Sequence, residues 1–121
     1  MLDTISAIST PFGTGGIAII RISGKNAIKI VDNVFSKSLQ KVKSHSAVFG
    51  KIIQNNELID EVIITIFKAP KSYTGENVVE ISCHGSIFIA NRILEILLQH
   101  SRLAEAGEFT QRAFLNNKID L

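Results

Sequence analysis

The apolar positions of the chain follow two periods, and together they predict a domain that mixes strands and helices. Apolar residues at every second position are typical of strands, whereas apolar residues three and four apart are typical of helices. The strand-like segments are 3–9, 17–22, 48–53, 58–67 and 79–84. The helix-like segments are 27–36, 87–99 and 108–116. The expected fold class is α+β, with a mixed or antiparallel sheet and about three helices.

Short polar residues and turn residues predict where these elements begin and end. Ser23 and Ser86 precede the segments 27–36 and 87–99 and are expected to cap these two helices. The run Gln54-Asn55-Asn56-Glu57 lies between two strand patterns and predicts a hairpin turn. Segment 102–107 is expected to be a short link.

The segment 17–22 is nearly continuous in β-branched residues and reads as a strand covered on both faces. Arg21 interrupts it on the same face as Ile17 and Ile19. An arginine in such a strand needs partners, because an unpaired buried charge is costly. Two readings remain open: Arg21 faces a ligand, or it lies at a strand end and reaches water or a neighbouring carboxylate.

The stretch 72–86 combines a polar, glycine-containing loop with a short alternating strand. One face of that strand is polar, and the other is apolar. The polar face carries Glu80, Ser82 and His84, and the apolar face carries Val79, Ile81 and Cys83. We therefore expect Cys83 to be a small buried thiol and the polar face to meet water or a ligand.

Composition narrows the classes of protein that fit. The 121 residues suit one domain, with 45% hydrophobic and 20% charged residues and a net charge of +2. A single cysteine excludes an internal disulfide and fits a reducing compartment. The start shows no signal peptide, and the longest apolar run, 17–20, is too short for a bilayer. We expect a cytoplasmic protein that does not contact a membrane.

Two glycine motifs resemble nucleotide-binding signatures but do not fit them. Residues 13–18 satisfy the loose dinucleotide fingerprint, yet they lead into a strand pattern where that motif requires a helix. Gly24-Lys25 lacks the glycine five positions earlier and the Ser or Thr that a phosphate-binding loop needs. The 121 residues therefore contain no nucleoside-triphosphatase signature.

Three charged residues stand out by placement: Arg21 and Glu80 in predicted strands, and Lys118 after a turn. A carboxylate on a partly buried strand can accept two adjacent donors of a ligand in parallel. The arrangement suits a small-molecule binding module, although a plain Glu–Arg ion pair explains it as well. No nucleophile with its base is present, so we expect no catalytic residue and no metal ligand.

Four ordered segments resemble the N-terminal domain of the tRNA-modification GTPase family called MnmE or TrmE. They are 3–11, 15–24, the stretch 72–80 with His84-Gly85, and 107–121. The resemblance runs from end to end of the chain. It implies a fold similar to the folate-binding domain of the glycine-cleavage T-protein. Residues 1–118 would form a folate-binding and dimerisation domain, and residues 119–121 would begin a helical domain.

The resemblance also implies a function. In the family this domain binds a tetrahydrofolate derivative, 5-formyl- or methylene-tetrahydrofolate, and holds a homodimer together. The whole enzyme hydrolyses GTP with potassium and magnesium in a separate GTPase domain. With the FAD-dependent partner MnmG (GidA) it places an aminomethyl-type group on C5 of the wobble uridine of tRNA. The chain itself would lack the GTPase domain and would not be catalytic.

Carried over by the same resemblance, the folate contacts fall on Arg21, Glu80 and Lys118. The amino-pyrimidine edge of the pterin offers adjacent N–H donors, which suits Glu80. Arg21 and Lys118 would meet polar oxygens or the glutamyl tail. Two alternatives stay open: a structural dimerisation domain with no ligand, and direct tRNA binding, which the absence of a basic stripe disfavours.

Overall fold

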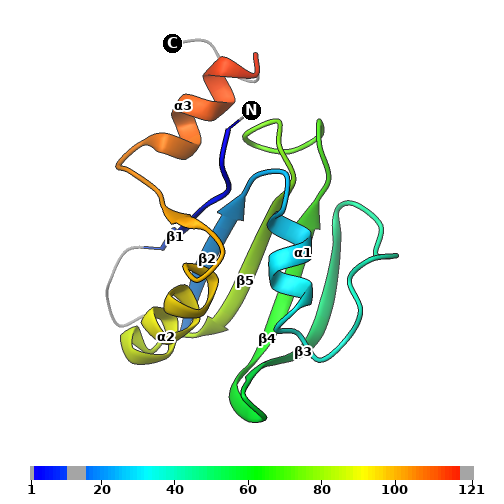
Figure 1. The fold of residues 1–121 in the computed structure, drawn as a ribbon, viewed down its shortest axis with the longest axis vertical. Helices are drawn as coiled ribbons and strands as arrows, with labels where there is room; N and C mark the ends of the chain where they lie inside the picture. Colours follow the sequence, from blue (N-terminus) through cyan, green and yellow to red (C-terminus); the bar gives the residue numbers. More distant parts are fainter. Residues whose placement is uncertain (1, 11–15, 118–121) are drawn as a thin grey trace.

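A six-stranded sheet in the order β3-β4-β5-β2-β1-β6 is the framework of the computed structural model (Figure 1), which describes residues 2–10 and 16–117. The strands are β1 (Ile5–Ile8), β2 (Ile17–Ser23), β3 (Ser46–Gln54), β4 (Glu57–Phe67), β5 (Val78–His84) and β6 (Arg102–Leu103). The helices are α1 (Ala27–Asp32), α2 (Ile87–Leu97) and α3 (Glu108–Leu115). Neighbouring strands are antiparallel except β1 and β6, which are parallel. The predicted α+β class with a mixed sheet and three helices is confirmed within the described residues.

The hydrophobic core lies between one face of the sheet and the helices α1 and α2 (Figure 1). Alternate positions of β2, β4 and β5 supply its strand side, as a period of two requires. Its buried members include Ile20, Ile22, Val31, Ile64, Val79, Ile81, Ile93 and Leu97. Cys83 is buried among them, as its place on the apolar face predicted.

The hairpin turn and the first residue of α2 follow their sequence signals. Asn55 and Asn56 both have positive φ, 52° and 63°, which is the backbone of a tight hairpin turn and explains the two asparagines. The hydroxyl of Ser86 accepts a hydrogen bond from the Ile89 N–H and caps α2. Among the described residues no helix has both the length and the apolar character needed to cross a bilayer.

The predicted capping role of Ser23 is wrong. Asn26 precedes α1 without a side-chain cap, while the Ser23 hydroxyl donates to Glu76 at 2.7 Å and contacts the Thr74 hydroxyl at 2.8 Å. The helix also ends at Asp32, earlier than expected, because Phe35 forms an isolated bridge with Ile52 of β3. The sequence position of Ser23, between a strand and a helix, does not show whether its hydroxyl caps α1 or bonds to the loop before β5.

The segment 102–107 is not only a link. Arg102 and Leu103 form β6 and pair with Ile5 and Ser6 of β1. Gly107 then adopts the left-handed conformation, with φ of 75°, and α3 begins at the next residue. The edge strand β6 therefore leads the chain to α3, which lies beyond one end of the sheet, near the described N-terminal residues (Figure 1).

Candidate functional site

One face of the sheet is not covered by α1 or α2, and we call it the open face. Residues on it include Ile17, Ile19, Arg21, Phe49, Ile63, Glu80 and Ser82. The expectation that segment 17–22 is covered on both faces is wrong, since the Ile17 side chain is 64% exposed. The predicted alternation itself is correct, because Ile20 and Ile22 are fully buried on the opposite face.

Strand register arranges the open face in rows that run across the sheet. Arg21 of β2 lies opposite Glu80 of β5, which lies opposite Thr65 of β4. The next row joins Ile19 to Ser82, Ser82 to Ile63, and Ile63 to Phe49. The open face therefore has a charged row beside a mainly apolar row.

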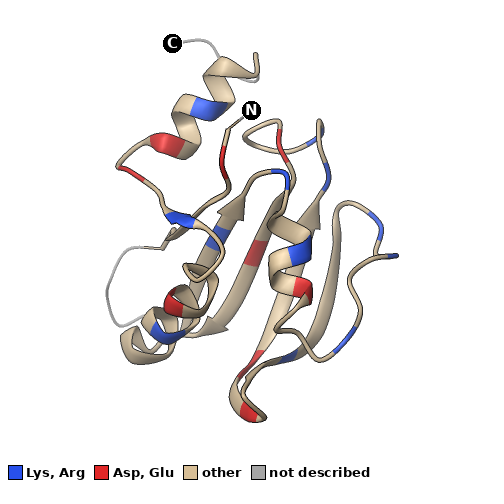
Figure 2. Ribbon diagram, viewed as in Figure 1, with Lys and Arg blue, Asp and Glu red and all other residues tan. Residues whose placement is uncertain are grey.

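Arg21 and Glu80 form an ion pair across the two strands. The Arg21 Nε and Nη2 atoms donate to the same Glu80 oxygen, Oε2, at 3.0 and 2.9 Å. Both side chains are about one-quarter exposed (25% and 24%). Within the described residues, neither Nη1 of Arg21 nor Oε1 of Glu80 takes part in a hydrogen bond. Among those residues the pair therefore leaves one donor group and one acceptor without a partner. Figure 2 shows the basic position on β2 beside the acidic one on β5.

Two aromatic rings cover the Arg21 guanidinium. Its Cζ atom lies 5.6 Å from the ring centroid of Tyr73 and 5.3 Å from that of Phe109 on α3. Both distances are within the range of a cation–π interaction. The Tyr73 hydroxyl lies 2.9 Å from the Thr110 hydroxyl, so the loop before β5 and α3 are joined directly above Arg21.

A hollow of about 320 Å³ lies beside Arg21 and the rings of Tyr73 and Phe109. It is lined by Ala7, Ile8, Ser9, Arg21, Tyr73, Ala104, Glu105, Ala106, Gly107, Phe109 and Thr110. The structure therefore brings Arg21 to the wall of a hollow and Glu80 to Arg21, although Glu80 does not line the hollow itself. The third predicted contact, Lys118, lies outside the described residues.

The residue that sequence reasoning missed is Arg112. Helical spacing in segment 108–116 predicts an apolar side made of Phe109, Ala113 and Phe114. In the structure Ala113 is fully buried, whereas Phe114 is 41% exposed and the Arg112 side chain is 2% exposed. A signal was available, since Arg112 follows Glu108 by one helical turn, but its partners Asp3 and Glu76 are distant in sequence.

Arg112 lies inside a cage of three carboxylates. Its Nη1 donates to the Glu76 Oε1 and Oε2 atoms at 3.1 and 3.2 Å, and also to the Asp3 carbonyl. Its Nη2 donates to Asp3 Oδ1 at 2.9 Å and to Glu108 Oε2 at 3.3 Å. The guanidinium thereby joins α3 to the N-terminal segment and to the loop before β5.

A second arginine, Arg102 of β6, holds two of the same carboxylates. It donates to Asp3 Oδ2 at 2.6 Å and to Glu108 Oε2 at 2.7 Å. Hydrogen bonds from Arg102 are the main reason that the pKa of Asp3 and of Glu108 falls to about 2. The same bonds raise the pKa of Arg102. Asp3 and Glu108 are therefore charged at neutral pH.

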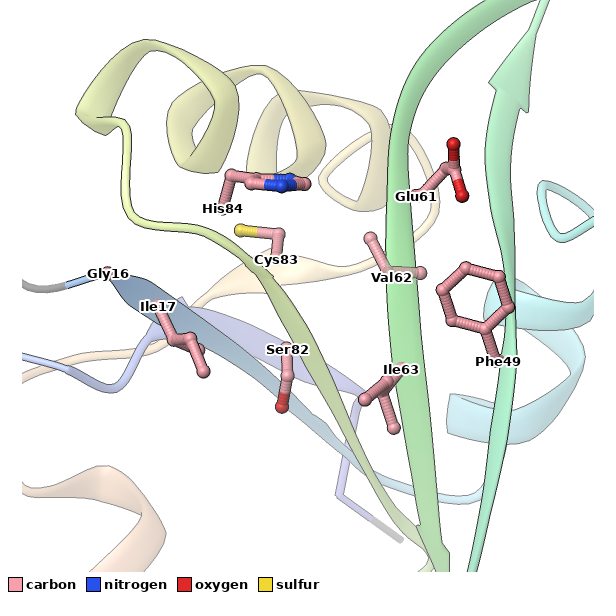
Figure 3. A pocket seen from close by; sticks show the side chains of 9 residues that line it. All are labelled: Gly16, Ile17, Phe49, Glu61, Val62, Ile63, Ser82, Cys83 and His84. Atoms are coloured by element: carbon pink, nitrogen blue, oxygen red, sulfur yellow. The ribbon is translucent and has the colours of Figure 1, made fainter.

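A second hollow of about 240 Å³ opens where β4 and β5 part (Figure 3). The ladder between these strands ends at the pair Ile63 and Ser82. Beyond it Asp60 connects them, since its carboxylate accepts the His84 N–H at 2.9 Å and lies 2.7 Å from His84 Nδ1. Burial, followed by the charge of Asp60, raises the pKa of the Cys83 thiol to about 11. Cys83 is thus an unreactive core thiol at neutral pH.

In residues 2–10 and 16–117, no three His, Cys, Asp or Glu side chains are grouped so as to hold a metal ion. The arrangement near Arg21 can instead recognise a polar, planar ligand. It offers a carboxylate oxygen, a guanidinium edge and aromatic surfaces from two different segments.

Comparison with known proteins identifies close relatives. The family described as "GTP-binding protein TrmE N-terminus" matches residues 4–118. A tRNA modification GTPase MnmE of Carboxydothermus hydrogenoformans is 55% identical, over 100% of this chain and 28% of that protein. The MnmE of Streptococcus thermophilus is 53% identical over 98% of this chain and 26% of that protein. The MnmE of Flavobacterium johnsoniae is 51% identical over 98% and 27%. The chain spans about a quarter of the length of these curated relatives.

Proposed function

The chain belongs to the TrmE N-terminal family, and from this premise we propose that it is the reduced-folate-binding and homodimerisation domain of a tRNA modification GTPase. The ligand would be a tetrahydrofolate derivative, in the 5-formyl or methylene form. Its contacts would be Arg21, Glu80 and Lys118.

The observation that carries this proposal is the Arg21–Glu80 pair on the open face. Because Arg21 occupies only the Oε2 atom of Glu80, the Oε1 atom is available to accept N–H donors from a pterin edge. The Nη1 group of Arg21 is available to donate to a carbonyl oxygen. A pair that offers an acceptor beside a donor suits the amino-pyrimidine edge of a pterin, which carries both kinds of group.

The surroundings of the pair support a flat ligand of moderate size. The hollow of about 320 Å³ is at the lower end of the volumes found for small-molecule sites, which run from about 300 to 1,000 Å³. Tyr73 and Phe109 supply aromatic surface there. A heterocycle placed beside these rings would exclude water from its hydrogen bonds with Arg21 and Glu80, which strengthens them.

The rest of the proposal concerns a longer protein of the same kind as the MnmE relatives, of which this chain would form the N-terminal part. We propose that this domain, residues 1–118, delivers the folate as one-carbon donor, and that residues 119–121 lead into a helical domain. GTP hydrolysis with potassium and magnesium would belong to a GTPase domain outside this chain. MnmG (GidA), with its FAD, and tRNA would be the partners, in the cytoplasm.

Calorimetry with 5-formyltetrahydrofolate tests the ligand. The protein should bind, and Glu80→Gln should bind at least about 10-fold more weakly, because a hydrogen bond to a charged group contributes about 1.5–3 kcal/mol. Glu95→Gln, an exposed position on α2, is the matched control and should bind like the wild type. Equal affinities of the Glu80→Gln variant and the wild type would disprove the role of the carboxylate.

A second candidate function is dimerisation without a ligand, and the apolar row of the open face favours it. Phe49 and Ile63 lie side by side on β3 and β4 and are 56% and 46% exposed. Two copies related by a twofold axis could bury this row against each other. Sedimentation with and without the folate, read beside the calorimetry, separates the candidates. A dimer that produces no heat of binding supports the second one.

A further inference from the structure

We propose that Arg112 is a positioning residue for the ligand site: it anchors α3 so that Phe109 covers Arg21, and the docking of α3 is therefore coupled to ligand binding. The inference rests on the proposed function for the identity of the ligand. The anchoring step itself rests on the contacts of Arg112 alone.

Helix α3 is held to the domain by charge more than by apolar burial. Its two buried residues are Arg112 and Ala113, and it contributes no residue to the main hydrophobic cluster. The apolar residues Phe114 and Leu115 are 41% and 58% exposed. The position of α3 therefore depends mainly on the cage around Arg112 and on the hydrogen bonds of Thr110 and Asn116 with the loop before β5.

The cage is well connected but incomplete. Both terminal nitrogens of Arg112 have carboxylate partners, whereas its buried Nε atom has no hydrogen-bond partner within the described part of the chain. A buried polar network with one unsatisfied member is less stable than a complete one. Such docking can be lost while the apolar core stays intact, as expected of a low-stability segment.

Two short routes connect Arg112 to Arg21. Through α3, Phe109 lies one turn before Arg112 and places its ring 5.3 Å from the Arg21 guanidinium carbon. Through the loop, Glu76 Oε1 accepts from Arg112 and also from the hydroxyl of Ser23. Ser23 is two residues after Arg21 on β2, so both side chains lie on the same face of the strand.

Coupling between the two sites follows from this geometry. A ligand beside Arg21 contacts Phe109 and Thr110 only when α3 is docked, because both residues belong to that helix. If docking strengthens ligand binding by some factor, ligand must strengthen docking by the same factor. We expect a factor of about 10, within the range of roughly 5 to 150 that is typical of coupled sites.

The test compares Arg112→Met with the wild type, with Arg112→Lys and Glu108→Gln as milder variants. Arg92→Met is the matched control, since Arg92 is exposed on α2 and its nearest carboxylate, of Glu57, is 4.0 Å away. Hydrogen exchange measures the protection of the α3 amides, and the α2 amides serve as the internal reference. Tyrosine fluorescence gives a second readout, because Tyr73 is the single tyrosine, no tryptophan is present, and its hydroxyl contacts Thr110.

In Arg112→Met we expect the amides of α3 to exchange at least about 10-fold faster while those of α2 keep their protection. Affinity for 5-formyltetrahydrofolate should fall about 10-fold. Arg112→Lys should give a partial effect, since lysine restores the charge without the planar fork. Arg92→Met should change none of these quantities.

A second measurement tests whether Arg112 acts through Phe109. In a Phe109→Leu background, Arg112→Met should weaken folate binding much less than it does alone, because the ring through which it acts is absent. An equal loss in both backgrounds would overturn the proposal. Unchanged exchange of the α3 amides in Arg112→Met would also overturn it. The same holds if α2 and α3 lose protection together in both Arg112→Met and Glu108→Gln. If the wild type binds no folate, the proposed function fails, and exchange and fluorescence then decide the anchoring step.

Discussion

Helices α2 and α3 are attached to the same sheet by opposite means. Helix α2 buries Ala90, Ile93, Ile96 and Leu97 in the core and begins at a serine cap. Helix α3 buries one arginine and one alanine and begins at an uncapped glycine. Hydrophobic burial is non-directional, whereas an ionic cage depends on geometry and on protonation.

The difference places stability and ligand recognition in separate parts of the molecule. The face covered by α2 contains the core, which includes the unreactive thiol of Cys83. The aromatic ring that α3 supplies is instead part of the candidate ligand site. A helix whose docking is weaker than the core can respond to a ligand without unfolding the domain.

The largest effect is expected from a cavity under α2. Ile93→Ala should lower the free energy of unfolding by about 2–5 kcal/mol, since Ile93 is fully buried in the cluster. Urea unfolding followed by circular dichroism measures it. Leu94→Ala is the control, being only partly buried on the same helix, and should cost less. If Ile93→Ala released α2 alone and left the sheet folded, the assignment of α2 to the cooperative core would be wrong.

An effect of intermediate size is expected from acid, and it should be confined to α3. The pKa values of Asp3 and Glu108 are lowered to about 2 from ordinary values of 3.8 and 4.5. A carboxylate with a lowered pKa stabilises the folded state fully above its ordinary value and loses that contribution as pH falls through the folded one. Docking of α3 should therefore weaken between about pH 4.5 and pH 2.

Tyr73 fluorescence followed against pH measures this release, and far-UV circular dichroism follows the remainder of the domain. The fluorescence change should come at higher pH than the loss of the sheet signal. In Glu108→Gln the docking of α3 should already be weaker at neutral pH, before acid releases the helix. Coincident transitions would show that α3 and the core form one cooperative unit.

The smallest effect is expected at the cap of α2. Ser86→Ala removes the hydrogen bond from the Ile89 N–H and should cost about 1 kcal/mol, within a range of roughly 0.5–2. Thermal unfolding measures the loss, and Ser86→Asp should restore it because aspartate is an equally good cap. A loss as large as that of Ile93→Ala would mean that Ser86 does more than cap a helix.

Much of the sheet could be predicted because its signals are local. The alternation in 79–84 correctly separates Glu80, which is partly exposed, from Val79 and Ile81, which are buried. The two asparagines of the hairpin adopt the positive φ that their turn requires. The alternation in 17–22 likewise placed Arg21 on the face with Ile17 and Ile19. These are consequences of a period of two and of single-residue backbone preferences.

Local sequence patterns establish which residues share a face and where the turns lie. The partners of the charged residues follow from the complete fold: Arg21 pairs with Glu80, 59 residues apart, and Arg112 with Asp3, 109 residues apart. It also moved Ser23 from a helix cap to Glu76. The physical reason is that alternation and caps act over a few residues, whereas a buried charge is satisfied by whichever opposite charge the completed fold brings within hydrogen-bonding distance.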